Sequence, residues 1–182
     1  ADQNVASNAS ESMVVFDPLG VLLAIMPWNY PFWQFIRFAA PALAAGNAAL
    51  LRHASNVPQC ARALENAFEL AGAPDGLVTT LLVEHGVVAE LIDDPRIAAL
   101  TLTGSTEVGR QIAAQAGRAM KKQVLELGGS DPFIVLADAD IAQAAKTAVK
   151  ARFSNTGQSC ISSKRFIVES SVADRFVALL CE

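Results

Sequence analysis

The stretch Val-Leu-Leu-Ala-Ile-Met-Pro-Trp-Asn-Tyr-Pro, at residues 21–31, decides the fold. It begins with a continuous apolar run that has the length of one buried strand. The two prolines stiffen the turn that follows, and the chain then continues in a helical pattern. A strand that leads directly into a helix is the building block of an α/β sheet.

Short apolar runs and longer helical patterns keep alternating along the rest of the chain. We expect further strands at residues 48–51, 77–82, 97–102, 123–127, 133–136 and 165–168. Helical patterns lie between them, including residues 105–117, residues 141–153 and a segment with one apolar face formed by Ala61, Leu64, Phe68 and Ala71. The sequence therefore predicts an α/β fold, in which a Rossmann-like parallel sheet has helices on both faces and a second α/β domain begins.

The expected domain boundary lies near Gly128-Gly129-Ser130, because two glycines let the chain change direction after a strand. We expect one domain over residues 1–128 and the first part of another over residues 129–182. Residues 1–12 are polar and lack the basic start and apolar centre of a secretory signal. We interpret them as a frayed leader.

The composition is apolar and weakly charged, with 52% hydrophobic residues, 18% charged residues and a net charge of -4. Lys and Arg do not form runs, which argues against nucleic acid as a partner. Prolines and Gly46 interrupt the apolar stretches before they reach the roughly 20 residues of a membrane-spanning helix, so we expect no membrane span. The low charge indicates either part of a longer polypeptide or an Ala-rich domain with an oligomer interface.

The three cysteines differ in what their surroundings predict. An odd number with no close pair argues against a disulfide framework and against a zinc site, and fits a reducing cytoplasm, so we expect no metal. Cys160 ends the polar, Gly-containing turn at residues 155–160, and a thiol in such a loop is a candidate nucleophile. We expect Cys60, on its helix face, to be a small core residue.

Glu126 interrupts an apolar strand just before flexible backbone. A carboxylate there costs desolvation energy unless it is paired, protonated or directed into a cavity. One interpretation is a strand-end residue that faces water or pairs with Lys121 or Lys122. The other is a carboxyl group with a raised pKa that acts as a general base.

Two turns after strands are further candidates. Asn29 lies between two aromatic residues in the turn after the first strand, and its amide can either donate into a site or simply form the turn. Gly104 and Ser105 join a strand to a helix start, where free N–H groups and the helix dipole suit a phosphate. This spacing matches neither dinucleotide nor Walker fingerprints, so ordinary helix capping is the alternative.

Taken together and in this order, four segments resemble the aldehyde dehydrogenase superfamily from about Val14 to the end of the chain. They are Pro-Trp-Asn-Tyr-Pro at 27–31, Leu-Thr-Gly-Ser-Thr-Glu-Val-Gly at 102–109, Leu-Glu-Leu-Gly-Gly at 125–129 and Asn-Thr-Gly-Gln-Ser-Cys at 155–160. The resemblance implies that residues 1–128 form an NAD(P)-binding domain and that residues 129–182 begin the catalytic domain. It also implies a chain cut from a longer polypeptide that forms homo-oligomers.

By this resemblance Cys160 is the nucleophile, Glu126 the base and Asn29 an oxyanion donor that works with the Cys160 N–H. The cofactor, NAD or NADP, is then expected to contact Pro27, Trp28, Arg52, Ser55, Gly104, Ser105, Leu127 and Gly128. Family members restricted to NAD commonly carry an acidic residue at the place of Ser55, so the uncharged Ser55 predicts that NADP is admitted. Arg52 stands where the family usually has Lys, an exchange of different shape and donors.

The likeness extends to bacterial succinate-semialdehyde dehydrogenases through residues 27–37 and 128–135. Arg37 lies on an otherwise apolar helix, where a buried guanidinium needs a carboxylate. That carboxylate is either the distal group of a semialdehyde or a structural ion-pair partner. Some relatives carry a second Arg where this chain has Ser154, a departure that weakens the case for a dicarboxylic substrate.

Three alternatives remain beside oxidation of succinate semialdehyde to the acid. The first is a dehydrogenase for another small aldehyde. The second is an inactive cofactor-binding fragment in which Cys160 and Glu126 are only structural. The third is an acylating enzyme that transfers the acyl group to coenzyme A, although such an enzyme needs no hydrolytic base and Glu126 argues against it.

Overall fold

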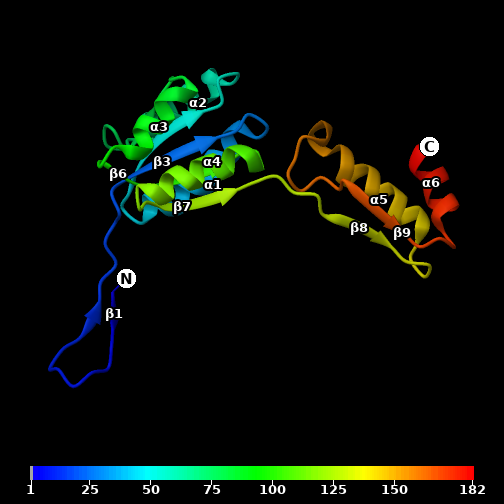
Figure 1. The fold of residues 1–182 in the computed structure, drawn as a ribbon, viewed down its shortest axis with the longest axis horizontal. Coiled ribbons are helices and arrows are strands. Elements are labelled where there is room, and N and C mark those ends of the chain that lie inside the picture. The colour runs from blue at the N-terminus through cyan, green and yellow to red at the C-terminus, as the bar shows by residue number, and fades with distance from the viewer. Residues whose placement is uncertain (1) are drawn as a thin grey trace. The chain divides into compact units, whose positions relative to one another are not determined.

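The computed structural model describes residues 2–182, which form two compact units (Figure 1). Unit 1 ends at Glu126, and unit 2 comprises Leu127–Glu182. Each unit has its own sheet and its own hydrophobic core, and each is described by itself.

The sheet of unit 1 has five parallel strands in the order β5-β4-β3-β6-β7. They are β3 (Val21–Met26), β4 (Ala48–His53), β5 (Val78–Thr80), β6 (Ile97–Thr103) and β7 (Lys122–Glu126). The central strand is almost fully covered, which explains its unbroken apolar sequence. The predicted parallel α/β sheet is confirmed, and β3 begins and ends at the expected residues.

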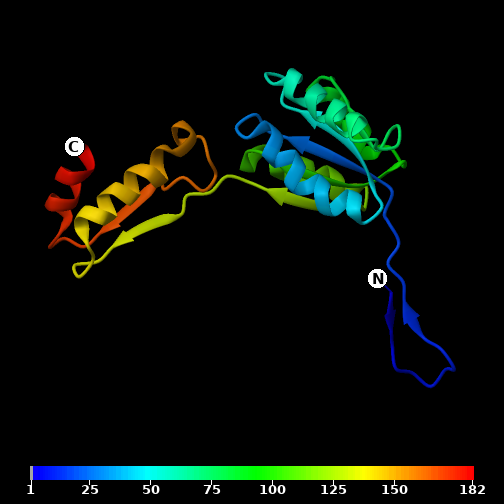
Figure 2. The ribbon, with the colours of Figure 1, turned by 180° about the vertical axis from the view of Figure 1, so that it is seen from behind.

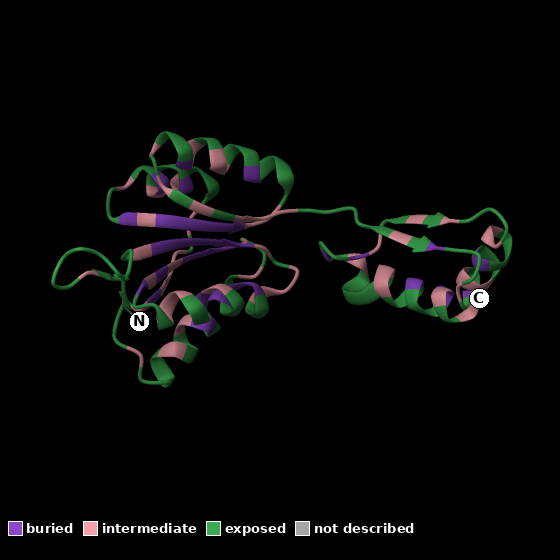
Figure 3. Cartoon of the chain, turned by 90° about the horizontal axis from the view of Figure 1, so that it is seen from below, coloured by how far each residue is buried: buried purple, intermediate pink, exposed green. Residues whose placement is uncertain are grey.

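Helices cover both faces of this sheet, as predicted (Figure 3). On one face α1 (Pro31–Ala44) packs against α2 (Pro58–Leu70), and on the other α3 (His85–Asp93) packs against α4 (Thr106–Arg118). Connections between parallel strands of one sheet are almost always right-handed, so the reversal of strand order after β5 places α3 and α4 on the opposite face. In residues 2–182 no helix is long and apolar enough to cross a membrane.

The core of unit 1 joins β3 and β4 to the two helices on their face. Phe35 of α1 is fully buried, and its ring contacts Phe38 and Phe68. Ala61 and Leu64 are buried in the same cluster and Phe68 packs against it, so these three residues of the expected helix face are confirmed. Ala71, the fourth, is exposed and lies just beyond the end of α2. Cys60, expected in the core, is only half-buried.

Unit 2 is a parallel βαβ segment followed by one more helix (Figures 1 and 2). Strand β8 (Pro132–Val135) pairs in parallel with β9 (Arg165–Val168). Between them run α5 (Ile141–Phe153), which starts and ends where the sequence predicts, and the short 3₁₀ helix η1 (Ser154–Gly157). Helix α6 (Ala173–Cys181) packs on α5 and buries Phe176 completely.

The first residues do not form the frayed leader expected from their polar composition. Strand β1 (Gln3–Asn4) pairs antiparallel with β2 (Met13–Val14). The Val5 N–H donates to the Ser12 carbonyl over 2.9 Å, and the hydroxyls of Ser7 and Ser12 lie 2.6 Å apart. Polar side chains do not prevent a hairpin, because the pairing is made by backbone groups.

Candidate active site

The candidate residues of unit 1 lie at the carboxyl ends of its parallel strands. The connection from β3 leads to β4 on one side of the sheet, whereas the connection from β6 leads to β7 on the other side. This point, between two adjacent strands whose connections diverge, is where open α/β sheets bind ligands. The loop after β3 carries Asn29, and the loop after β6 carries Gly104 and Ser105.

Ser105 is the N-cap of α4, because its hydroxyl accepts a hydrogen bond of 3.3 Å from the Val108 N–H. The Gly104 N–H donates to the Glu126 carbonyl over 3.0 Å, which ties this turn to the end of β7. The helix start expected here is confirmed. Contact of this turn with a cofactor pyrophosphate stays a prediction.

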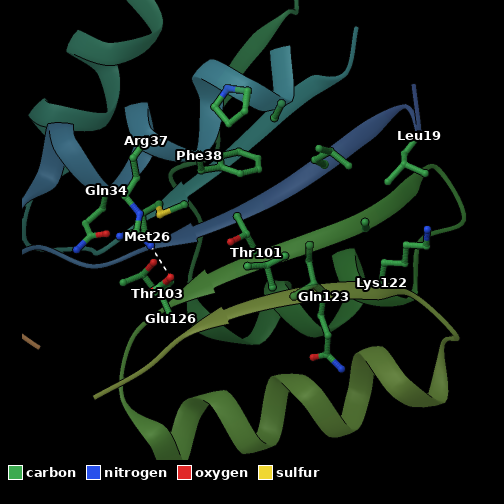
Figure 4. Close-up of a pocket in the computed structure, with 16 residues that line it drawn as sticks. Leu19, Met26, Gln34, Arg37, Phe38, Thr101, Thr103, Lys122, Gln123 and Glu126 are labelled. Carbon is green, nitrogen blue, oxygen red and sulfur yellow. Dashed lines mark ion pairs between the residues drawn. The ribbon is translucent and has the colours of Figure 1, made fainter. Parts of the chain in front are cut away.

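The Glu126 side chain forms an ion pair with Arg37 of α1, over 2.7 Å between Oε1 and Nη2 (Figure 4). The proposed partners Lys121 and Lys122 were wrong, because the end of β7 faces α1. The expectation that Arg37 is buried was also wrong, since its side chain is 38% exposed and that of Glu126 is 47% exposed. Both groups therefore remain accessible to a ligand.

A cavity of about 610 Å³ opens between α1 and the strands β6 and β7 (Figure 4). Gln34, Arg37, Thr103 and Glu126 form a polar end, with Met26 beside them. The remaining wall is mainly apolar and includes Leu19, Leu22, Phe38, Pro41, Ala42, Ala99, Leu100 and Val124. An apolar cavity with a few polar groups at one end suits a small organic ligand.

A second cavity, of about 540 Å³, lies at the ends of β4 and β5. Arg52, Ser55 and Glu84 are among the residues that line it. Arg52 is only 3% exposed, and its Nε has no hydrogen-bond partner within residues 2–182. Burial lowers the pKa of Arg52 from its ordinary value. A buried guanidinium with an unused donor suits an oxygen-rich ligand such as a nucleotide.

His53 lies beside Arg52, and sequence reasoning gave it no role. The Ala54 N–H donates to its Nδ1, and its Nε2 donates to the Pro31 carbonyl, each over 2.9 Å. Desolvation is the largest effect on its pKa and lowers it, the Pro31 hydrogen bond raises it, and the charge of Arg52 lowers it, with a lowered pKa as the result. His53 thus joins β4 to the start of α1, next to the Asn29 loop. Only its place between Arg52 and Ser55 in the sequence could have indicated this.

Cys160 lies at the exposed tip of a tight turn in unit 2. The Ser162 N–H donates to the Ser159 carbonyl over 3.2 Å, and both serines are buried, so the base of the turn is fixed. Asn155 and Thr156, just before it, have φ values of 52° and 59°. This conformation is unfavourable for a β-branched residue such as Thr156, and strained backbone of this kind clusters at functional sites.

The predicted site residues are divided between the two units. Asn29, Arg37 and Glu126 belong to unit 1, together with the predicted cofactor contacts from Pro27 to Ser105. Cys160 belongs to unit 2, as do Leu127 and Gly128. Arg37 and Glu126 are in direct contact, whereas the meeting of Cys160 with Asn29 and Glu126 stays a prediction. Within residues 2–182 no group of three or more His, Cys, Asp or Glu side chains could hold a metal ion.

Comparison with known proteins agrees on one family. A probable NADP-dependent succinate-semialdehyde dehydrogenase of Synechocystis is 60% identical over 176 residues, which are 97% of this chain and 39% of that protein. An aldehyde dehydrogenase of Paenarthrobacter nicotinovorans is 61% identical over 93% of this chain and 37% of its own length. The chain thus spans less than half the length of these relatives.

Solved structures and the sequence pattern of the family give the same result. The succinic semialdehyde dehydrogenase of Streptococcus pyogenes, crystallised with NADP+, is 40% identical and superposes with a TM-score of 0.93 over 99% of this chain and 40% of its own. The pattern of the aldehyde dehydrogenase family matches residues 1–182. The chain belongs to the aldehyde dehydrogenase family.

Proposed function

We propose that the complete polypeptide oxidises succinate semialdehyde to the dicarboxylic acid, with NADP or NAD as the hydride acceptor. The observation that carries this proposal is the half-exposed Arg37 guanidinium at the polar end of an apolar cavity, where it already holds one carboxylate. Arginine has five N–H donors, so Arg37 can hold a second carboxylate beside Glu126. The names of the relatives from Synechocystis and Streptococcus support the same substrate.

The reaction begins at the exposed thiol. The Cys160 thiolate adds to the aldehyde carbon, and the oxygen becomes an oxyanion held by the Asn29 amide and the Cys160 N–H. A nicotinamide cofactor held near Arg52 and Ser55 would supply the hydride acceptor, and loss of hydride from the adduct would leave a thioester on Cys160. Glu126 then removes a proton from water, which attacks the thioester and releases the acid and the thiol.

The cofactor fits the cavity at the ends of β4 and β5. There the buried Arg52 offers an unused donor, and the exposed Ser55 carries no charge that would repel a phosphate. Glu84 lines the same cavity and can accept hydrogen bonds from ribose hydroxyls. We therefore expect NADP to bind at least as well as NAD.

Comparison of the two cofactors tests this assignment. Replacement Ser55→Asp places a negative charge beside the expected 2'-phosphate and should raise the KM for NADP at least tenfold, while the KM for NAD changes less than threefold. Ser55→Ala is the matched control, because it removes the hydroxyl without adding charge. A strong preference for NAD in the unaltered protein, or an equal effect of Ser55→Asp on both cofactors, would contradict the assignment.

The substrate is tested with succinate semialdehyde and an uncharged aldehyde of similar length. A charge-assisted hydrogen bond contributes about 1.5–3 kcal/mol, so Arg37→Leu should raise the KM for succinate semialdehyde roughly ten- to hundredfold. Arg37→Leu also removes the ion pair with Glu126. This second effect should change the oxidation of both aldehydes equally, because hydrolysis of the thioester is common to them. The ratio of the two effects therefore reports the substrate carboxylate alone.

Arg62→Leu is the control, since Arg62 is exposed on α2 and lines neither described cavity. Arg62→Leu should leave both KM values unchanged. Equal effects of Arg37→Leu on the two aldehydes would refute a substrate that carries a carboxylate while leaving aldehyde oxidation intact. Absence of activity with every aldehyde in the unaltered complete protein would refute the proposed function itself.

A further inference from the structure

Lys164 lies four residues after Cys160 and directly before β9. Its ammonium group contacts backbone carbonyls rather than a carboxylate. Its Nζ donates to the carbonyl oxygens of Gly129, Cys160 and Ser159 over 2.6, 3.1 and 3.3 Å. An ammonium has three N–H donors, so these three acceptors match it fully. All of these residues belong to unit 2.

Two of these carbonyls determine how the Cys160 backbone is oriented. The Ser159 carbonyl and the Cys160 N–H belong to the same peptide group, and in a trans peptide they point in opposite directions. No peptide bond in residues 2–182 is cis. Because Lys164 holds the Ser159 carbonyl, the Cys160 N–H points away from the ammonium. Lys164 also holds the Cys160 carbonyl, which fixes the peptide group between Cys160 and Ile161.

The third carbonyl connects the turn to the segment that enters β8. A Cβ atom added to Gly129 would lie 3.4 Å from the Cys160 carbonyl oxygen, so the two backbones approach closely. Lys164 joins both segments at this approach, because it holds the Gly129 and Cys160 carbonyls together. Charge-assisted hydrogen bonds are shorter and stronger than neutral ones, which suits them to fixing a loop that is otherwise exposed.

We propose that Lys164 is a positioning residue that acts through backbone carbonyls to orient the Cys160 N–H as an oxyanion donor. This inference rests on the proposed function, in which that N–H stabilises the adduct formed by the Cys160 thiolate. Oxyanion stabilisation depends on donor direction, and a misplacement of about 1 Å can cost about a hundredfold in rate. Lys164 therefore contributes to the rate without contact with the substrate.

The test compares two reactions of the same thiol in the complete polypeptide. Addition to an aldehyde creates an oxyanion, whereas alkylation by iodoacetamide displaces iodide and creates none. Lys164→Met keeps the length and apolar stem of the side chain and removes all three donors. We expect kcat/KM for aldehyde oxidation to fall about ten- to hundredfold, and the alkylation rate of Cys160, followed by mass spectrometry, to stay within about twofold of that of the unaltered protein.

Two further variants complete the design. Lys164→Arg retains charge and several N–H donors and should recover at least a tenth of the unaltered kcat/KM. Lys146→Met removes one exposed charge from α5 and should change neither reaction. An unchanged oxidation rate in Lys164→Met would overturn the inference, as would a parallel loss of both reactions, or a Lys164→Arg protein no better than Lys164→Met. Failure of the proposed function is distinct, because the unaltered protein would then oxidise no aldehyde.

Discussion

Acid should destabilise unit 1 through His53, which has both ring nitrogens engaged. The Ala54 N–H donates to Nδ1, while Nε2 donates to the Pro31 carbonyl. A proton added at Nδ1 would face the Ala54 N–H and remove that hydrogen bond. Burial, aided by the charge of Arg52, lowers the pKa of His53 from its ordinary value despite the opposing effect of the Pro31 bond.

The direction of the pH effect follows from the lowered pKa. At a pH below about 6.5, the ordinary value for His, the unfolded chain binds a proton that the folded chain does not. The contribution of neutral His53 to stability is therefore complete above that pH, and it is lost as the pH falls through the folded pKa. One proton changes the free energy of unfolding by at most about 1.4 kcal/mol per pH unit.

Three variants separate this effect from others. His53→Leu removes two hydrogen bonds of about 1 kcal/mol each, so at pH 8 it should lower the free energy of unfolding by about 2 kcal/mol. His53→Gln retains a donor near the position of Nε2 and cannot titrate, so the acid sensitivity should largely disappear. His85→Gln is the control, because His85 is the other histidine of the chain and is exposed at the start of α3.

Urea denaturation of the 182-residue chain between pH 5 and pH 8 provides the measurement. Tryptophan fluorescence reports unit 1, since both tryptophans, Trp28 and Trp33, lie there. The reasoning is refuted if His53→Gln keeps the full pH dependence of the unaltered chain, or if His85→Gln abolishes it.

Three more outcomes follow from individual contacts. A double-mutant cycle with Arg37→Leu and Glu126→Gln should give a coupling free energy of no more than about 1 kcal/mol in urea denaturation, because the pair is half-exposed; a larger value would show that it is desolvated. Ser105→Ala should lower the stability of unit 1 by about 0.5–2 kcal/mol through loss of the α4 cap, and Ser105→Asp should retain it. Phe176→Ala should lower the stability of unit 2 by about 3–5 kcal/mol, seen as faster amide exchange in α5 and α6 with exchange in β3 unchanged.

Local patterns predicted the elements well because each signal lies within the element itself. The apolar run at Val21–Met26 and the helical pattern at Ile141–Phe153 have the bounds that the structure gives them. The N-cap at Ser105 was visible from a small polar residue before a helical pattern. The hairpin of the first residues was missed, because its pairing depends on backbone groups that polar composition does not reveal.

Contacts between distant segments could not be predicted in the same way. The partner of Glu126 is Arg37, which lies far from it in the sequence and meets it at the end of the cavity between α1 and the strands β6 and β7. The three carbonyls around Lys164 include Gly129, which is brought to it by the parallel pairing of β8 and β9. The residue types were visible in the sequence, but their partners depend on the tertiary structure.

The charged residues Arg52 and Glu126 of unit 1 lie at the ends of strands, where a buried parallel sheet can accommodate a charge. The interior of β3, β4 and β6 is covered by helices on both faces, so a charge there would lose its hydration without gaining a partner. At the carboxyl ends of the strands the helices depart and the loops begin, and Arg52 and Glu126 occupy these ends. Glu126 meets the guanidinium of Arg37, whereas the Arg52 Nε finds no acceptor within residues 2–182. A donor that is buried and unused costs stability, and a bound nucleotide would offset that cost. This is why we propose the carboxyl ends of the strands as binding sites.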